Sequence, residues 1–257
     1  MIVTTSGRPN KSSIYKAKEI ALQLNKPFMN RSKRSVEEMK QYYAQDVLVV
    51  GKNRLELHIL HSNEPLFFHP NSAMFRIKRL LNHEEDPFCI ACKLHEGDTF
   101  LDCTLGLASD SIVASFVVGQ EGIVQGIEAN EILAYVVHEG LKKWETGIKS
   151  FDSAMRRIEV NTGNHLDFLR SYPDNSFDVV YFDPMFAETI SDSKGISPLR
   201  NIADYSPLSS ETIEEAKRVA KRRIVLKDHW KSHRFIEHNF TVAVRKSAKF
   251  HYGVIEI

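Results

Sequence analysis

The sequence of 257 residues lacks the features of membrane-spanning, secreted and disulfide-stabilised proteins. No apolar run reaches about 18 residues, the length that a membrane-spanning helix needs. The opening residues, MIVTTSGRPNKSS, contain no apolar segment of the kind that secretory signals carry. Three cysteines are too few for a disulfide framework, and Cys89 and Cys92 have no second pair to complete a zinc site, so we expect them on a buried helix face. A cytoplasmic protein without metal or membrane contact is therefore expected.

Glycine is also scarce in the segment that most resembles a nucleotide-binding loop. FLDCTLGLASD, residues 100–110, runs from an apolar stretch into a turn and a predicted helix, but Gly106 is its only glycine. This is a poor match to the GxGxxG pattern that binds a dinucleotide pyrophosphate. S-adenosylmethionine carries no phosphate, and its ammonium and sulfonium charges favour acidic neighbours. The segment is therefore compatible with that methyl donor.

Net charge is small, at +1, but it is unevenly distributed. Residues 1–40 contain nine Lys and Arg against three acids, and residues 217–257 contain eleven against three. Residues 41–216 contain fourteen against twenty-seven. Basic ends around an acidic middle are compatible with binding to the phosphates of RNA, whereas the run Lys217–Arg223 is as compatible with a solvated helix face.

The first third of the chain predicts a small α+β segment over residues 1–70. Ser12 is expected to cap a helix that runs to about Leu24, and Ser35 to cap a second helix over VEEMKQYY. Short apolar runs predict four strands: Ile2–Thr5, Val47–Val50, Leu55–Leu60 and Leu66–Phe68. A helix should follow Pro70 and begin the main domain, residues 71–257. Its expected apolar side consists of Ala73, Ile77, Leu80 and Leu81.

From about residue 97 apolar runs alternate with helix-like segments, which predicts a mainly parallel sheet with helices on both faces. The expected strands are Thr99–Cys103, Ile123–Ile127, Arg157–Asn161, Phe177–Phe182 and Arg223–Leu226. The expected helices are Ser109–Val118, Glu131–Lys143, Leu166–Arg170 and Ser210–Arg222. Two final strands, Phe240–Ser247 and Phe250–Ile257, have no helix between them and should pair antiparallel. The expected fold is α/β, a Rossmann-like class I methyltransferase sheet that ends in an antiparallel hairpin.

Acidic side chains follow the first two strands of this predicted sheet. The carboxyl ends of parallel strands are where such sheets bind ligands, so Asp102 should lie at the cofactor crevice, beside a turn that Gly106 makes tight. Ser109 and Asp110 open the next helix near its donor-rich N-terminus. Glu128 ends the second strand 22 residues after Gly106, a spacing typical of an acid that binds ribose hydroxyls. A surface glutamate beside a helix cap is the alternative.

The third strand is followed by Gly163-Asn164-His165, where class I methyltransferases contact adenine. Polar side chains at Asn164 and His165 could meet the adenine amine. A partly exposed loop histidine is the alternative for His165.

The fourth strand ends in Asp183-Pro184-Met185-Phe186, which resembles the (D/N)-P-P-(F/Y/W) motif of methyltransferases that act on exocyclic amines of bases. An aryl amine is a weak nucleophile because its lone pair is delocalised into the ring. Acceptors on its hydrogens, the Asp183 carboxylate and the Pro184 carbonyl, favour attack by the nitrogen, and Phe186 offers a face for stacking the base. We predict catalytic roles for Asp183, Pro184 and Phe186. A strand-ending Asp-Pro turn without catalytic function is the alternative.

Four segments together resemble the small-subunit ribosomal RNA guanine-N2 methyltransferases of type J: LDCTLGLASD, YFDPMF, RRIVLKDHW and KSAKFHYGVIEI. The resemblance covers about residues 97–257. It implies a class I fold, S-adenosylmethionine as the donor and a guanine amine as the acceptor. It also implies cofactor contacts at Ser109, Asp110, Glu128, Ala129, Asn164, His165 and Asp183.

The chain departs from that family at four positions. Leu105 and Ala108 replace a small residue and a second glycine, Ser109 replaces an arginine, and Ala187 replaces a proline. The cofactor assignment is compatible with these changes, but the acceptor nucleotide does not follow from the resemblance.

The sequence thus predicts methyl transfer from S-adenosylmethionine to an exocyclic base amine in RNA, with guanine N2 of small-subunit ribosomal RNA as the specific acceptor. Methylation of a protein amide or a small molecule is one alternative, and a non-catalytic RNA-binding protein with this fold is another. Lys227 could reach the cleft or extend along the surface into solvent. The polar stretch 187–210 is a candidate substrate-covering loop.

Overall fold

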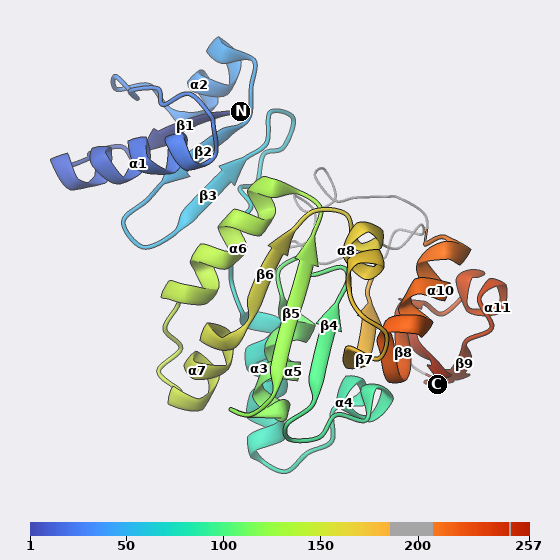
Figure 1. The fold of residues 1–257 in the computed structure, drawn as a ribbon. Coiled ribbons are helices and arrows are strands. Elements are labelled where there is room, and N and C mark those ends of the chain that lie inside the picture. Colours follow the sequence, from blue (N-terminus) through green and yellow to red (C-terminus); the bar gives the residue numbers. More distant parts are fainter. Residues whose placement is uncertain (186–207, 247) are drawn as a thin grey trace.

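A seven-stranded sheet with the order β6-β5-β4-β7-β8-β10-β9 forms the body of the molecule (Figure 1). The computed structural model describes residues 1–185, 208–246 and 248–257. The strands of this sheet are β4 (Thr99–Asp102), β5 (Ile123–Glu128), β6 (Glu159–Thr162), β7 (Phe177–Phe182), β8 (Ala220–His229), β9 (Thr241–Ala243) and β10 (Phe250–Glu256). From β6 to β8 neighbouring strands pair parallel, and β10 pairs antiparallel with both β8 and β9. This arrangement confirms the predicted Rossmann-like α/β sheet and its antiparallel hairpin.

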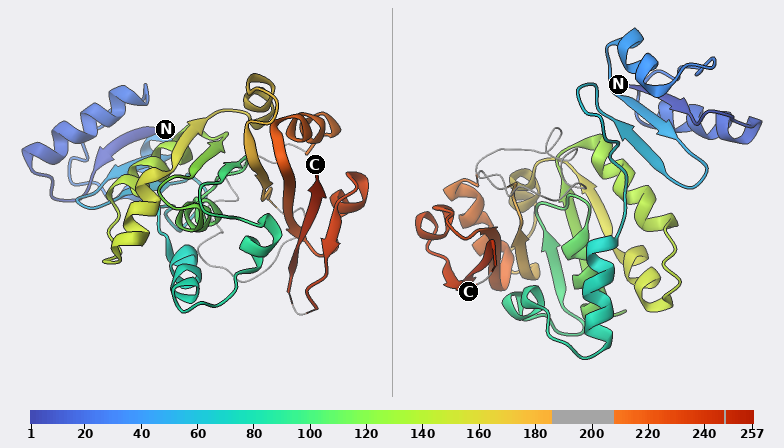
Figure 2. Two further views of the ribbon diagram at one scale, coloured as in Figure 1. Left: turned by 60° about the horizontal axis from the view of Figure 1, so that its bottom comes forward. Right: turned by 180° about the vertical axis from the view of Figure 1, so that it is seen from behind.

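Helices cover both faces of the sheet because neighbouring strand residues point to opposite sides. Phe100 and Val179 face one hydrophobic cluster, whereas Leu101 and Val180 face the other. On the side of the main sheet, the first cluster contains residues of α3 (Asn71–Leu81), α4 (Pro87–Cys92), α5 (Ser109–Val118), α6 (Glu131–Lys143) and α7 (Lys149–Arg157). The second cluster contains residues of α8 (His165–Ser171), α10 (Ser210–Val219) and α11 (Arg234–Glu237). Figure 2 shows the two helical layers on either side of the sheet.

A second, three-stranded sheet belongs to the N-terminal unit. It has the order β1-β2-β3, made of β1 (Ile2–Thr5), β2 (Val47–Val50) and β3 (Leu55–His58), with helices α1 (Lys11–Gln23) and α2 (Val36–Tyr43). Ser35 caps α2 as expected, since its hydroxyl accepts from the Glu38 N–H and the Glu38 carboxylate accepts from the Ser35 N–H. The unit packs beside α6 (Figure 1).

Several sequence expectations about element boundaries are wrong. Asn10, not Ser12, caps α1, because the Asn10 Oδ1 accepts from the Ser13 N–H at 2.8 Å. The helix expected to reach Arg222 ends at Val219, because β8 already begins at Ala220, where it pairs with Phe177 of β7.

Other differences concern short or marginal segments. Leu66–Phe68 forms no strand; Leu66 makes only an isolated bridge to Leu57. Leu81 is 47% exposed rather than on the buried side of α3. The α7 helix has no counterpart among the expected elements, whereas Cys89 and Cys92 do lie on α4, half-buried and buried respectively.

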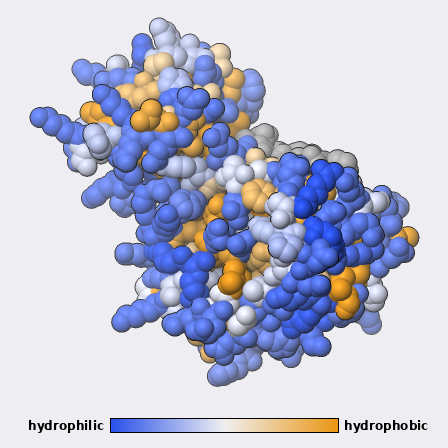
Figure 3. Space-filling view, viewed as in Figure 1, coloured by the Kyte–Doolittle hydropathy of each residue, from blue (hydrophilic) through white to orange (hydrophobic). Residues whose placement is uncertain are grey.

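Figure 3 shows a mostly hydrophilic surface on which apolar residues occur in small groups. Within the described ranges, none of the helices has the length and apolar character to span a bilayer. The same ranges contain no group of three or more His, Cys, Asp or Glu side chains arranged to hold a metal ion.

Candidate cofactor and acceptor site

The predicted site residues lie at one edge of the sheet. Asp102 ends β4, Glu128 ends β5 and Asp183 directly follows β7. The register places Asp102 beside Gly126 of β5 and Tyr181 of β7, so these strands end close together. The carboxyl edge of the sheet therefore brings three acidic side chains from distant parts of the chain into one region.

Asp102 is buried and directs its carboxylate at its own loop. Its Oδ1 accepts from the Thr104 N–H at 3.0 Å, and its Oδ2 accepts from the Ser111 hydroxyl at 2.6 Å. Burial raises the pKa of Asp102 to about 7, against the opposing effect of these two hydrogen bonds. Asp102 thus connects the end of β4 to the first turns of α5 and shapes the loop between them.

The loop turns sharply at Gly106 and Ala108, which have φ angles of 50° and 61°. The left-handed region suits glycine at Gly106, where an added Cβ would meet no atom of the described residues closer than 3.9 Å. As far as the described residues go, the position of that Cβ is therefore open to a ligand.

Glu128 joins this loop to the end of β5. Its Oε2 accepts from the Gly106 N–H at 3.1 Å, and its Oε1 accepts from the Asn130 N–H at 2.9 Å. The side chain is mostly buried, at 7% exposure of the residue, and Ala129 beside it is exposed. The ribose-binding acid expected from the spacing therefore lies against the glycine turn.

Ser109 provides a direct test of whether the site fits S-adenosylmethionine. Its buried Oγ, at the first position of α5, has no hydrogen-bond partner among the residues that the structure describes. A buried hydroxyl without a partner is costly, and a polar ligand group would satisfy it. The unsatisfied hydroxyl, the open turn and the acidic strand ends fit a zwitterionic cofactor, which Ser109, Gly106 and Glu128 would contact.

The third strand end supplies Asn164 and His165. The Asn164 Oδ1 accepts from the Leu166 N–H at 2.8 Å and so caps α8. The His165 ring packs edge-on against Phe182, with the ring centres 6.0 Å apart. The preceding Gly163 donates its N–H to the Glu128 carbonyl at 2.9 Å, so this turn lies next to the end of β5. Adenine contacts by Asn164 and His165 stay a prediction.

Asp183 is held on two sides. Its N–H donates to the Thr104 hydroxyl at 2.6 Å, and its Oδ2 accepts from the Lys227 ammonium at 2.6 Å. The side chain keeps 28% exposure. Burial raises the pKa of Asp183 to about 6, the Lys227 charge opposes this rise, and the Asp110 charge adds to it. Asp183 is therefore a fixed carboxylate that still reaches solvent.

Lys227 belongs to a buried chain of charges. Besides Asp183, its ammonium binds the Asp110 Oδ2 at 3.0 Å. The Tyr181 hydroxyl donates to the same oxygen at 2.7 Å, and Arg76 binds the Asp110 Oδ1. These cations hold the pKa of Asp110 well below its usual range in spite of burial. The surface position considered for Lys227 is wrong, because the side chain is inside this network.

The sequence interpretation missed Arg76, Asp86 and Tyr181. Arg76 of α3 donates from Nε and NH2 to the two Asp86 oxygens, each at 2.8 Å. Asp86 also accepts from the Phe88 N–H as the cap of α4. The available signal was an arginine between apolar residues of α3 and an acid before Pro87, which indicates a cap but not its partner.

Parts of the expected acceptor site lie outside the described residues. Pro184 and Met185 are half-buried after Asp183, whereas Phe186 and Ala187 are outside the described ranges. The same holds for the expected covering loop up to residue 207.

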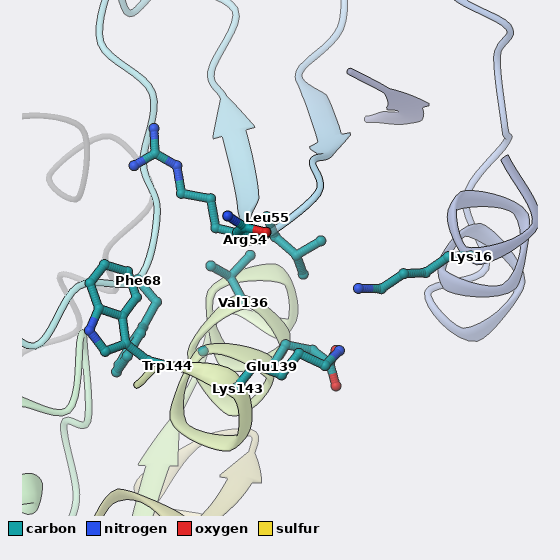
Figure 4. Close-up of a pocket in the computed structure, with 10 residues that line it drawn as sticks. Lys16, Arg54, Leu55, Phe68, Val136, Glu139, Lys143 and Trp144 are labelled. Atoms are coloured by element: carbon teal, nitrogen blue, oxygen red, sulfur yellow. The ribbon is translucent and has the colours of Figure 1, made fainter. Parts of the chain in front are cut away.

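A pocket away from the strand ends lies between the N-terminal unit and α6 (Figure 4). Lys16, Leu55, Phe68, Glu139 and Trp144 are among its lining residues. Burial and the nearby Lys143 ammonium lower the pKa of Lys16. None of the predicted cofactor residues lines this pocket, so it is distinct from the candidate site.

The sheet order, its reversed final strand and the acidic strand ends define a class I S-adenosylmethionine-dependent methyltransferase. The chain belongs to the family described as "Putative SAM-dependent methyltransferase", whose model matches residues 32–254. S-adenosylmethionine is therefore its methyl donor.

Three individual proteins are similar to this chain. The chain is 51% identical over 255 residues to "Uncharacterized protein YpiP" of Bacillus subtilis, with 99% of each chain covered. It is 31% identical over 86 residues to the ribosomal RNA small subunit methyltransferase J of Pseudomonas syringae pv. syringae, which covers 34% of this chain and 30% of the relative. The crystal structure of the SAM-dependent methyltransferase NGO1261 from Neisseria gonorrhoeae has the same fold, with a TM-score of 0.65, 14% identity, and coverage of 100% of this chain and 96% of that one.

Proposed function

We propose that this methyltransferase acts on an exocyclic base amine in RNA, with guanine N2 of small-subunit ribosomal RNA as its acceptor. The observation that carries the proposal is the position of Asp183. Its carboxylate directly follows β7 at the carboxyl edge of the sheet, is held there by Thr104 and Lys227, and remains partly exposed.

Asp183 has the properties that an aryl amine acceptor requires. Bound S-adenosylmethionine supplies an electrophilic methyl group. Lys227 occupies the Asp183 Oδ2, so Oδ1 is the oxygen that can accept a hydrogen of the amine. With a pKa of about 6, the carboxylate is ionised at neutral pH and is a stronger acceptor than a neutral carbonyl. The carbonyl of Pro184, whose ring restricts the backbone, is the expected second acceptor. As these hydrogen bonds form, the lone pair of the amine nitrogen becomes more available for attack on the methyl carbon of S-adenosylmethionine.

RNA is favoured over other acceptors by two observations. The relative from Pseudomonas syringae carries the name of a small-subunit ribosomal RNA methyltransferase, and the match to it is 31% identical over 86 residues. The basic segments at both ends of the chain complement a polyanion. Flipping a base out of a helix costs a few kcal/mol, which contacts to phosphates can offset.

The experiment compares nucleosides from small-subunit ribosomal RNA of wild-type and deletion strains by mass spectrometry. We expect the deletion to remove one N2-methylguanosine, and purified wild-type enzyme with labelled S-adenosylmethionine to restore it in vitro. Enzyme with Asp183→Ala should not restore it. If ribosomal RNA modifications stay unchanged while a protein or a metabolite loses a methyl group, the acceptor is not RNA. If no methyl group is lost anywhere, a non-catalytic role replaces the proposal.

A further inference from the structure

The eleven basic residues of the segment 217–257 fall into groups with different surroundings. Five lie at the amino edge of the sheet in ion pairs: Lys217–Glu214, Arg218–Asp174, Lys221–Asp178, Arg222–Asp98 and Arg223–Glu256. Asp98 precedes β4 and Asp178 lies near the start of β7, so this group is at the opposite edge from Asp183. Lys217 and Arg218 thus lie on the partly solvated face of α10, whereas Lys221–Arg223 belong to β8. The whole run lies away from the candidate site.

Two more of these cations are neutralised inside the fold. Lys227 lies between Asp110 and Asp183, and Arg234 binds Asp228 at 2.9 Å. The remaining four have no carboxylate partner within the described ranges: Lys231, Arg245, Lys246 and Lys249.

All four unpaired cations lie at the carboxyl edge. Lys231 follows the end of β8, and the other three belong to the turn between β9 and β10. The register pairs Phe250 with His229, and the Trp230 N–H donates to the Lys249 carbonyl at 3.3 Å, which brings the two segments together. Figure 2 shows this turn at the end of the hairpin away from the C-terminus.

Two aromatic rings are interleaved with these cations. Trp230 is 51% exposed, and the Lys231 ammonium lies 4.9 Å from the centre of its ring. The Phe250 ring has the Lys227 ammonium and the Arg245 guanidinium each at 5.2 Å. Since Lys227 also binds Asp183, a continuous series of contacts runs from Asp183 through Phe250 to Arg245.

We propose that this surface, the carboxyl-edge patch (Trp230, Lys231, Arg245, Lys246, Lys249 and Phe250), binds single-stranded RNA next to the acceptor base. The inference rests on the proposed function and specifies where its substrate is held. Unpaired cations attract phosphates, and an exposed indole stacks on a base of any sequence. The patch borders Asp183, so a strand bound there would present its neighbouring nucleotide to the acceptor site.

Trp230 allows a direct test because the chain has only two tryptophans. In a Trp144→Phe background, Trp230 is the remaining tryptophan and can be excited selectively over the tyrosines. A 12-nucleotide oligouridylate serves as the probe. Stacking of a base on the indole should quench the Trp230 fluorescence as the probe saturates the protein. In anisotropy measurements with the labelled probe, Trp230→Ala should weaken binding about tenfold or more. Unquenched fluorescence at saturation would overturn the stacking role.

Charge is tested by a pair of matched variants. Lys231→Ser/Lys249→Ser removes two patch cations, and Lys217→Ser/Lys221→Ser removes two from the opposite edge. We expect only the first variant to weaken probe binding, by about tenfold or more. In a plot of the logarithm of the binding constant against the logarithm of the salt concentration, its slope should become shallower by about 0.7 for each lost phosphate contact. Both variants should bind S-adenosylmethionine as the wild type does. Equal probe affinity in the two variants would overturn the proposal that the carboxyl-edge patch binds RNA.

Methyl transfer to ribosomal RNA separates this inference from the proposed function. If the wild type methylates RNA and the patch variants do so with unchanged KM, the proposed function stands and the patch fails. If the patch binds the probe as expected but RNA is not methylated, the patch stands as an RNA-binding surface and the acceptor assignment fails.

Discussion

Asp102 and Glu128 both end strands at the cofactor edge, yet the structure uses them differently. Both oxygens of Asp102 accept hydrogen bonds from its own loop and from α5, so it acts on the cofactor mainly through the loop that it shapes. Glu128 also uses both oxygens, on the Gly106 and Asn130 amides, but the first of these bonds holds the Gly106 turn itself, on the side where the site faces a ligand. Glu128 is therefore the acid from which a direct contribution to affinity is expected.

Replacing Glu128 by Ala should weaken binding of S-adenosylmethionine at least about tenfold, or roughly 1.4 kcal/mol. The loss has two causes, the missing charged acceptor and the unsupported Gly106 turn. Isothermal titration calorimetry measures it. Glu131→Ala, an exposed acid in the first turn of α6, is the matched control and should leave affinity unchanged. Wild-type affinity in the Glu128 variant would remove this residue from the site.

Methyl transfer should also depend on the protonation of Asp183. Its pKa of about 6 lies above the ordinary value of an aspartate, so the carboxylate becomes protonated as pH falls through about 6. The protonated group loses its ion pair with Lys227 and accepts the amine hydrogen less well. The single-turnover rate should therefore fall on the acidic side of about pH 6, at saturating cofactor.

Asp183→Ala should lose activity by several orders of magnitude while keeping most of its cofactor affinity.

Lys227 offers a check on this assignment. Its ammonium lowers the pKa of Asp183, so Lys227→Met should move the acidic fall in rate to higher pH, whereas Lys227→Arg, which keeps the charge, should move it less. An acidic limb that stays at the same pH in both variants would show that another group controls it.

The strands and helices of the main sheet were largely predictable because their apolar periodicity is strong. The strand-end acids were found for the same reason: once strands are assigned, parallel pairing places their carboxyl ends together. The charge network was not predictable, because Arg76 and Asp86 come from α3 and the cap of α4, and no local pattern indicates their long-range pairing. The start of β8 was missed because the basic residues of the run resemble a helix end, although tertiary pairing with β7 makes them a strand.

The loop after β4 also shows how this chain accommodates a departure from the family it resembles. Leu105 stands where that family has a small residue, and it packs on Gly126 of β5. A Cβ added at Gly126 would lie 2.4 Å from the Leu105 Cδ1, so only glycine leaves room for leucine. The two positions form a complementary pair that fixes the turn before Gly106.

Gly126→Ala should therefore destabilise the protein by about 1–3 kcal/mol, the usual cost of overpacking a core. Because Leu105 precedes Gly106, its displacement should also weaken cofactor binding. Adding Leu105→Ala to this variant should recover part of both losses. Urea unfolding and calorimetry on the single and double variants measure the coupling. Additive losses in the double variant would mean that the two side chains do not constrain each other.

The two sheets share one hydrophobic core. The cluster that includes Val3, Leu48 and Leu57 of the N-terminal unit continues through Phe68 to residues of α6 and the main sheet. Phe68 packs directly on Gly140 of α6, where an added Cβ would be 2.2 Å from the Phe68 ring, and its ring is edge-on to Trp144 at 6.1 Å. Tyr135 of α6 also donates to the Gln23 side chain at 2.8 Å. We propose that the boundary expected near residue 70 separates two structural units that fold cooperatively.

Phe68→Ala should test this coupling because it removes a buried ring that packs between the two units. We expect a loss of about 3–5 kcal/mol in unfolding free energy, the usual cost of truncating a buried phenylalanine. Phe67→Ala is the matched control: the neighbouring ring is half-buried under the Arg54 guanidinium, so its loss should cost less. In a Trp230→Phe variant with Phe68 intact, circular dichroism and Trp144 fluorescence should report one coincident thermal transition, and saturating S-adenosylmethionine should raise both midpoints together. Two separate transitions in this variant, with only one raised by the cofactor, would show that the N-terminal unit folds independently of the methyltransferase core.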